Sequence, residues 1–324
     1  MDLLLGLDQG GTKTHALVCD LQGNALALGS APGCLHTVNG MQAALQCMGD
    51  AADMALQKIG AARRDIRYVS GGLTGIDYPY EQVLLTDELT RYFDARGVYV
   101  HNDCIGALYG GTFDVPSAVC CVGTGLNVGG ANKEGEVFQF GNYSNGPYGG
   151  GGTIGQQALQ HVFDAHIGKC PPTMMTRMFL AHTGCTDVDD LLLHRYRKHD
   201  VSPSKLCPLV FEAAGKGDQA AADILLRHAE SWAELTLCMA EQLGVHSDTG
   251  VTIVLSGSVF KGRPAIHIER IAQIISGRLP GAVIVPARYE PVVGGAVMGL
   301  QHAGNPGWQD RMRKTAEALG LTRE

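Results

Sequence analysis

The segment at residues 8–14 reads DQGGTKT and combines residue types that bind a phosphate chain and a divalent cation. A turn with two glycines exposes backbone N–H groups to phosphate oxygens, and threonine and lysine side chains add donors and positive charge. Asp8 ends the preceding strand, where its carboxylate can hold Mg²⁺ directly or through water. An ordinary hairpin turn is the alternative, and the spacing is not that of a Walker A loop. The residues expected to contact phosphates are Gly10, Gly11, Thr12, Lys13 and Thr14.

A second turn of this kind follows an apolar segment at residues 118–122. One such turn is common in proteins, but two of them at the openings of two similar halves predict loops that clamp one polyphosphate between two domains. The residues expected to contact phosphates in this turn are Gly123, Thr124 and Gly125.

A third turn follows the apolar segment 252–255 and reads Ser-Gly-Ser at residues 256–258. Its small residues would admit a flat adenine against the backbone, although a plain strand-to-helix turn is the alternative. Gly257 and Ser258 are the expected contacts, and Lys261 or Arg263 could reach the base.

A carboxylate lies where a predicted strand passes into a helix, at Asp103 in the segment 101–107. Such a carboxylate can accept the proton of an attacking hydroxyl. The alternative is a helix N-cap, because Asn and Asp are preferred there. The two phosphate-binding turns favour the catalytic interpretation for Asp103.

The elements that must position these residues follow from apolar periodicity and glycine turns. The first half is predicted to hold strands at 3–7, 14–19, 24–30, 68–71 and 98–101, with helices at 41–59 and 81–93. The second half begins again with strands at 118–122, 127–131 and 137–141, followed by a largely helical region with a long helix at 219–243. Buried strands at 252–255 and 283–285 and a final helix at 307–324 complete it. The order predicts a duplicated α/β fold with a boundary near 114–116.

Composition agrees with a two-domain globular protein of 324 residues, of which 45% are apolar and 18% charged. A net charge of −7 argues against a nucleic-acid or anionic-membrane partner. No apolar run approaches the roughly 20 residues that span a bilayer, and the N-terminal segment does not read as a signal peptide. The 10 cysteines are scattered, which favours reduced thiols and a cytoplasmic location.

These motifs, in this order, resemble the actin/hexokinase/heat-shock-70 ATPase superfamily. Within it the chain is similar to the N-acetylglucosamine kinase or BadF/BadG/BcrA/BcrD ATPase family over nearly its whole length. The segments that carry the resemblance are residues 6–14, 72–77, 102–103, 123–125, 256–258 and 291–296.

The resemblance implies two ribonuclease-H-like (actin-like ATPase) domains with a nucleotide cleft between them. The N-terminal domain would comprise residues 1–115, joined by the C-terminal helix at 305–324. The C-terminal domain would comprise residues 116–304, with a helical insertion at about 155–245. A homodimer is a further expectation from the family.

The resemblance also implies ATP-dependent phosphorylation of a hydroxyl of an amino sugar such as N-acetylglucosamine or glucosamine, with ATP and Mg²⁺ as cofactors. Asp103 would be the base, and Asp8 would position Mg²⁺, through water by preference. The residues expected near the sugar are His36, Gly75, Asp77, Asn127, Gly149 and Gly150.

One segment departs from the family pattern. Residues 146–151 read GPYGGG where relatives carry an acidic residue, and Pro147 can neither accept a hydroxyl proton nor donate from its backbone. Leu35 stands before His36 where glucosamine kinases commonly have Asn. A catalytically weakened sugar-binding paralogue is therefore one alternative function.

A second alternative is an ATPase activator that energises a reductase or dehydratase through an iron–sulfur cluster shared across a dimer. Cys104 and Cys120, near the expected cleft, keep this alternative open, with Cys121 beside them, although the length of the chain favours the kinase. The 12 histidines form no HExxH or similar motif, which argues against a structural zinc site. The basic cluster at 195–199 is interpreted as a solvated helix face.

Overall fold

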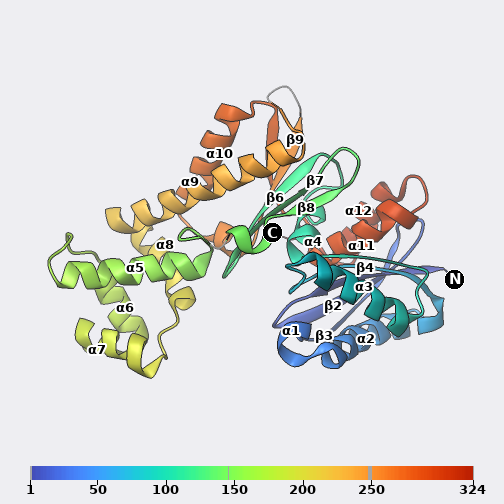
Figure 1. Cartoon of the computed structure of the whole chain (residues 1–324), viewed down its shortest axis with the longest axis horizontal. Coiled ribbons are helices and arrows are strands. Elements are labelled where there is room, and N and C mark those ends of the chain that lie inside the picture. The colour runs from blue at the N-terminus through green and yellow to red at the C-terminus, as the bar shows by residue number, and fades with distance from the viewer. Residues whose placement is uncertain (1, 145, 247–249, 324) are drawn as a thin grey trace. The chain divides into compact units, whose positions relative to one another are not determined.

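The computed structural model describes residues 2–144, 146–246 and 250–323 (Figure 1). It contains two five-stranded sheets with helices packed against them. Among the described residues, none of the helices combines the length and the apolar character that crossing a membrane requires.

The first sheet has the strand order β3-β2-β1-β4-β5. Its strands are β1 (Leu3–Gln9), β2 (Lys13–Asp20), β3 (Ala25–Pro32), β4 (Ile66–Leu73) and β5 (Gly97–His101). The pairs β1/β2 and β2/β3 are antiparallel, whereas β1/β4 and β4/β5 are parallel. The parallel pairs bring the ends of β1 and β4 to the same edge of the sheet, beside the first glycine turn.

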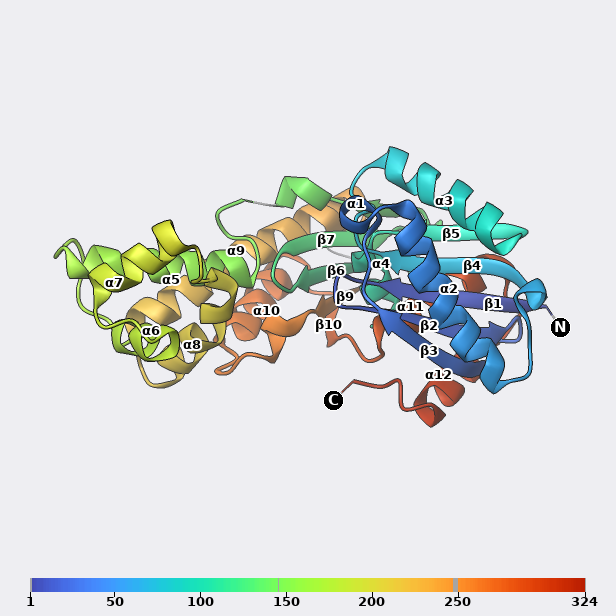
Figure 2. The same ribbon diagram turned by 90° about the horizontal axis from the view of Figure 1, so that it is seen from below.

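Helices cover both faces of this sheet, which explains why β1 is apolar at successive positions. On one face, Leu3, Leu5 and Leu7 share a core with α2 (Met41–Lys58) and α3 (Pro79–Phe93), and Figure 2 shows α2 lying across the strands. On the other face, α11 (Pro291–Ala303) lies so close to β1 that a Cβ on Gly6 would be 2.6 Å from Ala296 N. The short elements around this sheet are α1 (His36–Asn39), η1 (Arg63–Asp65), α4 (Asp103–Tyr109) and α12 (Trp308–Ala318).

The second sheet has the order β10-β9-β6-β7-β8. Its strands are β6 (Ser117–Val122), β7 (Leu126–Ala131), β8 (Val137–Gln139), β9 (Val251–Ser256) and β10 (Ala282–Pro286). Counted in chain order, each sheet runs third, second, first, fourth and fifth strand, which confirms the predicted duplication of one α/β fold.

Most of the remaining helices lie between β8 and β9 in the sequence. They are η2 (Gly141–Ser144), α5 (Gly151–His166), α6 (Met175–Thr183), α7 (Val188–Leu193), η3 (His194–Lys198), α8 (Pro203–Gly215) and α9 (Gln219–Gln242). Beyond β9 are η4 (Ser258–Lys261) and α10 (Ile266–Arg278).

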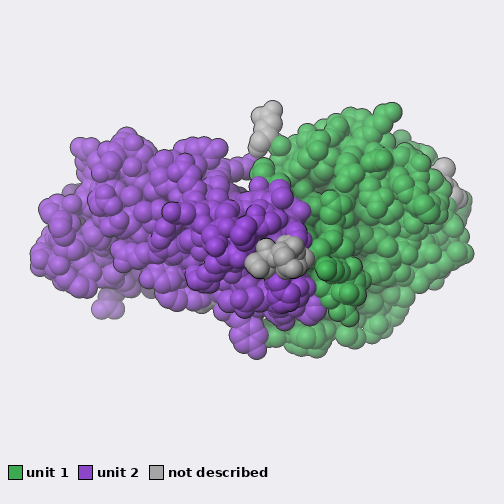
Figure 3. All heavy atoms as spheres, turned by 90° about the horizontal axis from the view of Figure 1, so that it is seen from above, with its two compact units in different colours: residues 1–119, 129–137, 285–324 green, residues 120–128, 138–284 purple. Residues whose placement is uncertain are grey.

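The chain divides into two compact units, coloured separately in Figure 3. Unit 1 comprises residues 1–119, 129–137 and 285–324, and unit 2 comprises residues 120–128 and 138–284.

Two predicted boundaries and one predicted burial were wrong. The strand predicted to reach Gly141 ends at Gln139, because Gly141 has a φ of 53° and begins a 3₁₀ turn. The last helix ends at Ala318, before Gly320 with a φ of 69°, and the end of its predicted range, residue 324, lies outside the described residues. The strand around Val283 is not buried, because it is the edge of its sheet and Val283 is 58% exposed.

Candidate active site

The first glycine turn presents an exposed backbone segment at the end of β1. Gly10 N–H donates to Lys13 O at 2.9 Å, which closes the turn, and residues 11–13 are exposed. Thr14 is fully buried and its hydroxyl donates to Pro32 O at 3.1 Å. The turn is therefore open to a ligand, while Thr14 joins β2 to β3.

Asp103 is the first residue of α4, directly after the residue that caps this helix. The cap is Asn102, whose side-chain oxygen accepts from Cys104 N at 3.0 Å. The carboxylate of Asp103 instead accepts a hydrogen bond from the Thr74 hydroxyl at 2.9 Å, on Oδ2. Since Asn102 serves as the cap, the structure removes the main alternative role for Asp103.

Asp8 and Asp103 lie close enough for the charge of Asp103 to affect the pKa of Asp8. Burial raises the pKa of Asp8 to about 7, and the charge of Asp103 raises it as well, whereas Lys13 and Arg323 lower it. Burial also raises the pKa of Asp103, opposed by the Thr74 hydrogen bond and supported by the charge of Asp77. Crowded carboxylates of this kind are oxygen ligands that suit Mg²⁺ and mark candidate catalytic sites.

Three of the predicted sugar contacts lie together in unit 1. Gly75 has a φ of 94°, and a Cβ on it would lie 3.0 Å from His36 Cε1. Asn102 Nδ2 donates to Asp77 Oδ1 at 3.1 Å and so links Asp77 to the start of α4. Burial raises the pKa of Asp77, and the neighbouring Glu81 adds to this rise, while His36 opposes it.

The imidazole of His36 has an unfilled hydrogen-bonding capacity. Both of its ring nitrogens are inaccessible to solvent and have no hydrogen-bond partner among the described residues. A buried polar atom without a partner costs free energy, and a ligand hydroxyl beside His36 would supply one.

The second glycine turn, in unit 2, is held by the first turn of α5. Gly123 N–H donates to Gly125 O at 3.0 Å. The N–H groups of Gly151 and Gly152 donate to Gly123 O and Thr124 O at 2.8 and 3.0 Å. Thr124 and Gly125 are exposed. The start of α5 thus fixes the carbonyl side of a turn whose other side remains accessible.

The third turn lies against the second. Gly257 has a φ of 110°, and a Cβ on it would overlap Val122 O, so only glycine fits this close approach. Ser258 is exposed.

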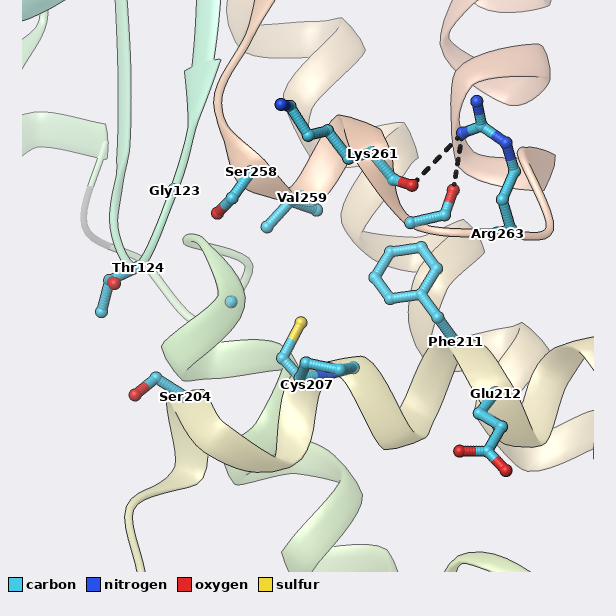
Figure 4. Close-up of a pocket in the computed structure, with 13 residues that line it drawn as sticks. Gly123, Thr124, Ser204, Cys207, Phe211, Glu212, Ser258, Val259, Lys261 and Arg263 are labelled. Carbon is cyan, nitrogen blue, oxygen red and sulfur yellow. Dashed lines mark hydrogen bonds between the residues drawn. The ribbon is translucent and has the colours of Figure 1, made fainter.

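A cavity of about 540 Å³ opens beside these two turns and has the size of a small-molecule site (Figure 4). Gly123, Thr124 and Ser258 line it, together with Lys261 and Arg263. The opposite wall is α8, which contributes Ser204, Cys207, Pro208, Phe211 and Glu212. The sequence identified the turns but missed α8, whose only signal is amphipathic periodicity without any indication of what its apolar face covers.

The remaining predicted sugar contacts lie in unit 2. Asn127 Oδ1 accepts from Gly141 N at 2.9 Å. Gly149 and Gly150 are buried, and a Cβ on Gly150 would overlap Gly125 O, so these glycines support the second turn. Trp232 Nε1 donates at 2.9 Å to both Tyr148 O and Gly149 O.

The segment that lacks the acidic residue is held through its backbone. Pro147 O accepts from Gln157 Nε2 at 2.7 Å. With proline at this position, no carboxylate side chain can act there as base or metal ligand.

The cysteines considered for an iron–sulfur cluster are poorly placed for that role. Cys104 is 1% and Cys120 0% exposed, and burial raises the pKa of Cys120 to about 12. Cys121 is partly buried. A cluster shared across a dimer requires thiolates at the surface, so this burial disfavours the activator function.

Two sheets of one repeated order, each with a glycine-threonine turn after its first strand, have the architecture of the actin-like ATPase fold. The chain belongs to the BadF/BadG/BcrA/BcrD ATPase family, because a sequence model of that family matches residues 5–299.

Several known proteins are similar over nearly the whole chain. An N-acetyl-D-glucosamine kinase from Dictyostelium discoideum is 27% identical over 313 residues, covering 92% of this chain and 98% of that protein. The structure of a candidate N-acetylglucosamine kinase from Chromobacterium violaceum matches with a TM-score of 0.68 at 20% identity, covering 93% of this chain and 99% of that one. A ROK family glucokinase from Streptomyces griseus, in complex with glucose and AMPPNP, matches with a TM-score of 0.54 at 18% identity, covering 96% and 99%.

Proposed function

We propose that this chain is an ATP-dependent kinase that phosphorylates a hydroxyl of an amino sugar such as N-acetylglucosamine or glucosamine. Membership of an ATPase family and the likeness to the Dictyostelium N-acetyl-D-glucosamine kinase support the reaction class. The observation that carries the proposal is the carboxylate of Asp103, which is held by the Thr74 hydroxyl and is not the cap of its helix.

In this proposal Asp103 accepts the proton of the attacking sugar hydroxyl, and Thr74 fixes the orientation of its carboxylate. Asp8 would hold Mg²⁺, which would neutralise charge on the phosphates when bound. The N–H groups of residues 11–13 and of Thr124 and Gly125 would donate to phosphate oxygens, while those of Gly10 and Gly123 close the two turns. The cavity lined by α8 and Ser258 would take the adenosine.

For the sugar, we propose that His36, Gly75 and Asp77 form the contacts in unit 1. His36 offers two nitrogens without partners, and Asp77 offers a carboxylate already fixed by Asn102. Asn127 is the proposed contact from unit 2, while Gly149 and Gly150 would act by supporting the glycine turn. An ATP-consuming reaction and ten cysteines without a disulfide favour the cytoplasm as its compartment.

The deciding experiment is a coupled assay of ADP release with N-acetylglucosamine, glucosamine, N-acetylmuramic acid and glucose. We expect one amino sugar to stimulate ADP release well above the rate with ATP alone. A folded sample that binds ATP but shows no sugar-stimulated release would overturn the kinase proposal. Sugar binding without turnover would instead indicate the weakened paralogue.

A further inference from the structure

A cysteine, an aspartate and a histidine converge in the helical part of unit 2, away from the residues assigned above. Cys185 follows α6, Asp190 lies in α7, and His194 begins η3. One ligand atom of each residue, the cysteine Sγ, a carboxylate oxygen and a ring nitrogen, lies within 4.8 Å of the other two. No other group of three or more such side chains in the described part of the chain meets this criterion.

The thiol of Cys185 has no competing role. It is 7% exposed and forms no disulfide, and no hydrogen bond of its sulfur is found among the described residues. A cysteine thiolate is a preferred zinc ligand, so this thiol is available to bind a metal together with the neighbouring carboxylate and imidazole.

The carboxylate of Asp190 is fixed on one side and open on the other. Its Oδ2 accepts from Thr186 N at 3.1 Å. Its Oδ1 lies 3.5 Å from His194 Nε2. Asp190 therefore has one oxygen held by the backbone and the other beside the imidazole of His194.

The imidazole of His194 is oriented by a further carboxylate. Its Nδ1 lies 3.0 Å from Asp200 Oδ2. In the tautomer whose Nδ1–H donates to Asp200, Nε2 carries the lone pair that a metal ion would use. A carboxylate that holds the second nitrogen of a metal-binding histidine is a common feature of zinc sites.

The ammonium group of Lys198 lies beside the proposed ligand atoms and would compete with a metal ion for them. Its Nζ lies 2.6 Å from His194 Nε2, and its side chain is exposed. An ammonium in this position neutralises the same ligand set, and the exposed side chain can move into solvent when a metal binds.

We propose that Cys185, Asp190 and His194 bind one Zn²⁺ ion, with Asp200 as the positioning residue. Thiolate, imidazole and carboxylate are the donors that zinc accepts, and three protein ligands leave a fourth position for water.

The ion would join the end of α6 to α7 and η3. The chain then continues through Asp200 to α8, which forms one wall of the 540 Å³ cavity. Zinc would thus stabilise the segment that leads into this wall. The proposal does not depend on the identity of the sugar or on the kinase reaction.

The test is a titration of chelator-stripped protein with Zn²⁺ in the presence of a chromophoric chelator. We expect one equivalent of Zn²⁺ per wild-type chain, and at least tenfold weaker binding in Cys185→Ser and in His194→Ala. Asp200→Asn should weaken binding 10- to 100-fold, the range found for such outer partners. Lys198→Met should tighten binding, because it removes the competing charge.

A matched control comes from the same unit. There Cys170 Sγ lies 3.6 Å from His161 Nε2, and no third ligand completes a cluster with them among the described residues. Cys170→Ser should retain the full zinc equivalent. Co²⁺ provides a second readout, since a thiolate-to-metal absorption band should appear in the wild type and in Cys170→Ser but not in Cys185→Ser.

No zinc bound at micromolar concentration, or equal binding in wild type, Cys185→Ser and His194→Ala, would overturn the proposal. Circular dichroism and AMPPNP affinity report whether each variant is folded. If the two ligand variants do not fold, Lys198→Met and Asp200→Asn decide the question, and unchanged affinity in both would reject the site.

Discussion

At the scale of single residues, Asp8, Asp77 and Asp103 are held in surroundings that raise the pKa of each carboxyl group. Burial is the largest cause in all three cases. This arrangement costs stability and is typical of sites where a carboxylate must bind a metal or move a proton. The chemistry of unit 1 can therefore be tested through individual side chains.

Asp103→Asn should lower kcat roughly 10²- to 10⁴-fold, the usual contribution of a general base. The affinity for AMPPNP should stay within about twofold, because the proposed adenosine cavity lies in unit 2. Steady-state assays and calorimetry check the two parts, with the exposed Asp114→Asn as control. Wild-type turnover in Asp103→Asn would place the base elsewhere.

Thr74→Val should move the acid limb of the kcat/KM profile to higher pH. The Thr74 hydrogen bond lowers the pKa of Asp103, so its removal raises that pKa and the active, ionised form appears later as pH increases. A pH profile of each variant measures the shift, and Thr74→Ser should restore the wild-type curve. If the acid limb of the kcat/KM profile of Thr74→Val stays at the wild-type pH, the ionisation of Asp103 does not determine it.

Asp8→Asn should stabilise the folded protein at pH 8 and abolish turnover. The pKa of Asp8 rises from 3.8 to about 7 on folding, so between these values the folded state holds a proton that the unfolded state has lost, and stability falls as pH rises. Removing the charge should increase the free energy of unfolding by roughly 1 to 4 kcal/mol at pH 8 and by little at pH 4. Denaturation at both pH values tests this, and an equal gain at each would contradict it.

At the scale of elements, glycines allow backbones to approach where side chains would prevent it. Gly6 admits α11 against β1, Gly257 admits the third turn against the end of β6, and Gly150 admits the start of α5 against the second turn. These contacts fix the positions of loops whose exposed faces remain available to a ligand.

Gly150→Ala should displace the second glycine turn, because the added Cβ would overlap Gly125 O and lie 2.7 Å from Gly123 O. We expect a loss of about 1–3 kcal/mol in stability, as for other overpacked sites, together with weaker AMPPNP binding. Gly146→Ala, only four positions earlier, meets nothing within 4 Å and should be nearly neutral. Urea denaturation and calorimetry distinguish the two, and equal behaviour would show that the turn tolerates the displacement.

At the scale of the whole molecule, the two units contain different parts of the proposed reaction. Unit 1 holds Asp8, Asp103 and the first turn, while unit 2 holds the second and third turns and the cavity lined by α8. Nucleotide binding and proton transfer should therefore be separable by substitution.

AMPPNP at a hundred times its Kd should stabilise the wild type and Asp103→Asn alike, by about 2.7 kcal/mol. Ser258→Glu should lose this gain, because it places negative charge in the cavity that would hold the nucleotide. Ser276→Glu, on an exposed helix position of the same unit, should keep it. Thermal denaturation with and without AMPPNP measures the effect. If AMPPNP stabilises Ser258→Glu as much as the wild type, the nucleotide does not bind in this cavity.

The sequence by itself determined the strands, the glycine turns between them and the repeated order of the two halves. These features depend on local rules: apolar alternation, the conformational freedom of glycine, and the preference of Asn and Asp for the start of a helix. The same rules placed Asp103 at a strand-to-helix junction, but they could not decide whether Asn102 or Asp103 caps the helix.

Only the tertiary structure decided what lies opposite each element. It placed α8 opposite the second and third turns, left Val283 on a sheet edge, and brought Cys185 to Asp190 and His194 without any recognised metal motif. The direction of a side chain relative to a distant element depends on packing between helices and sheets. That packing joins residues far apart in the chain and leaves no fixed spacing in the sequence.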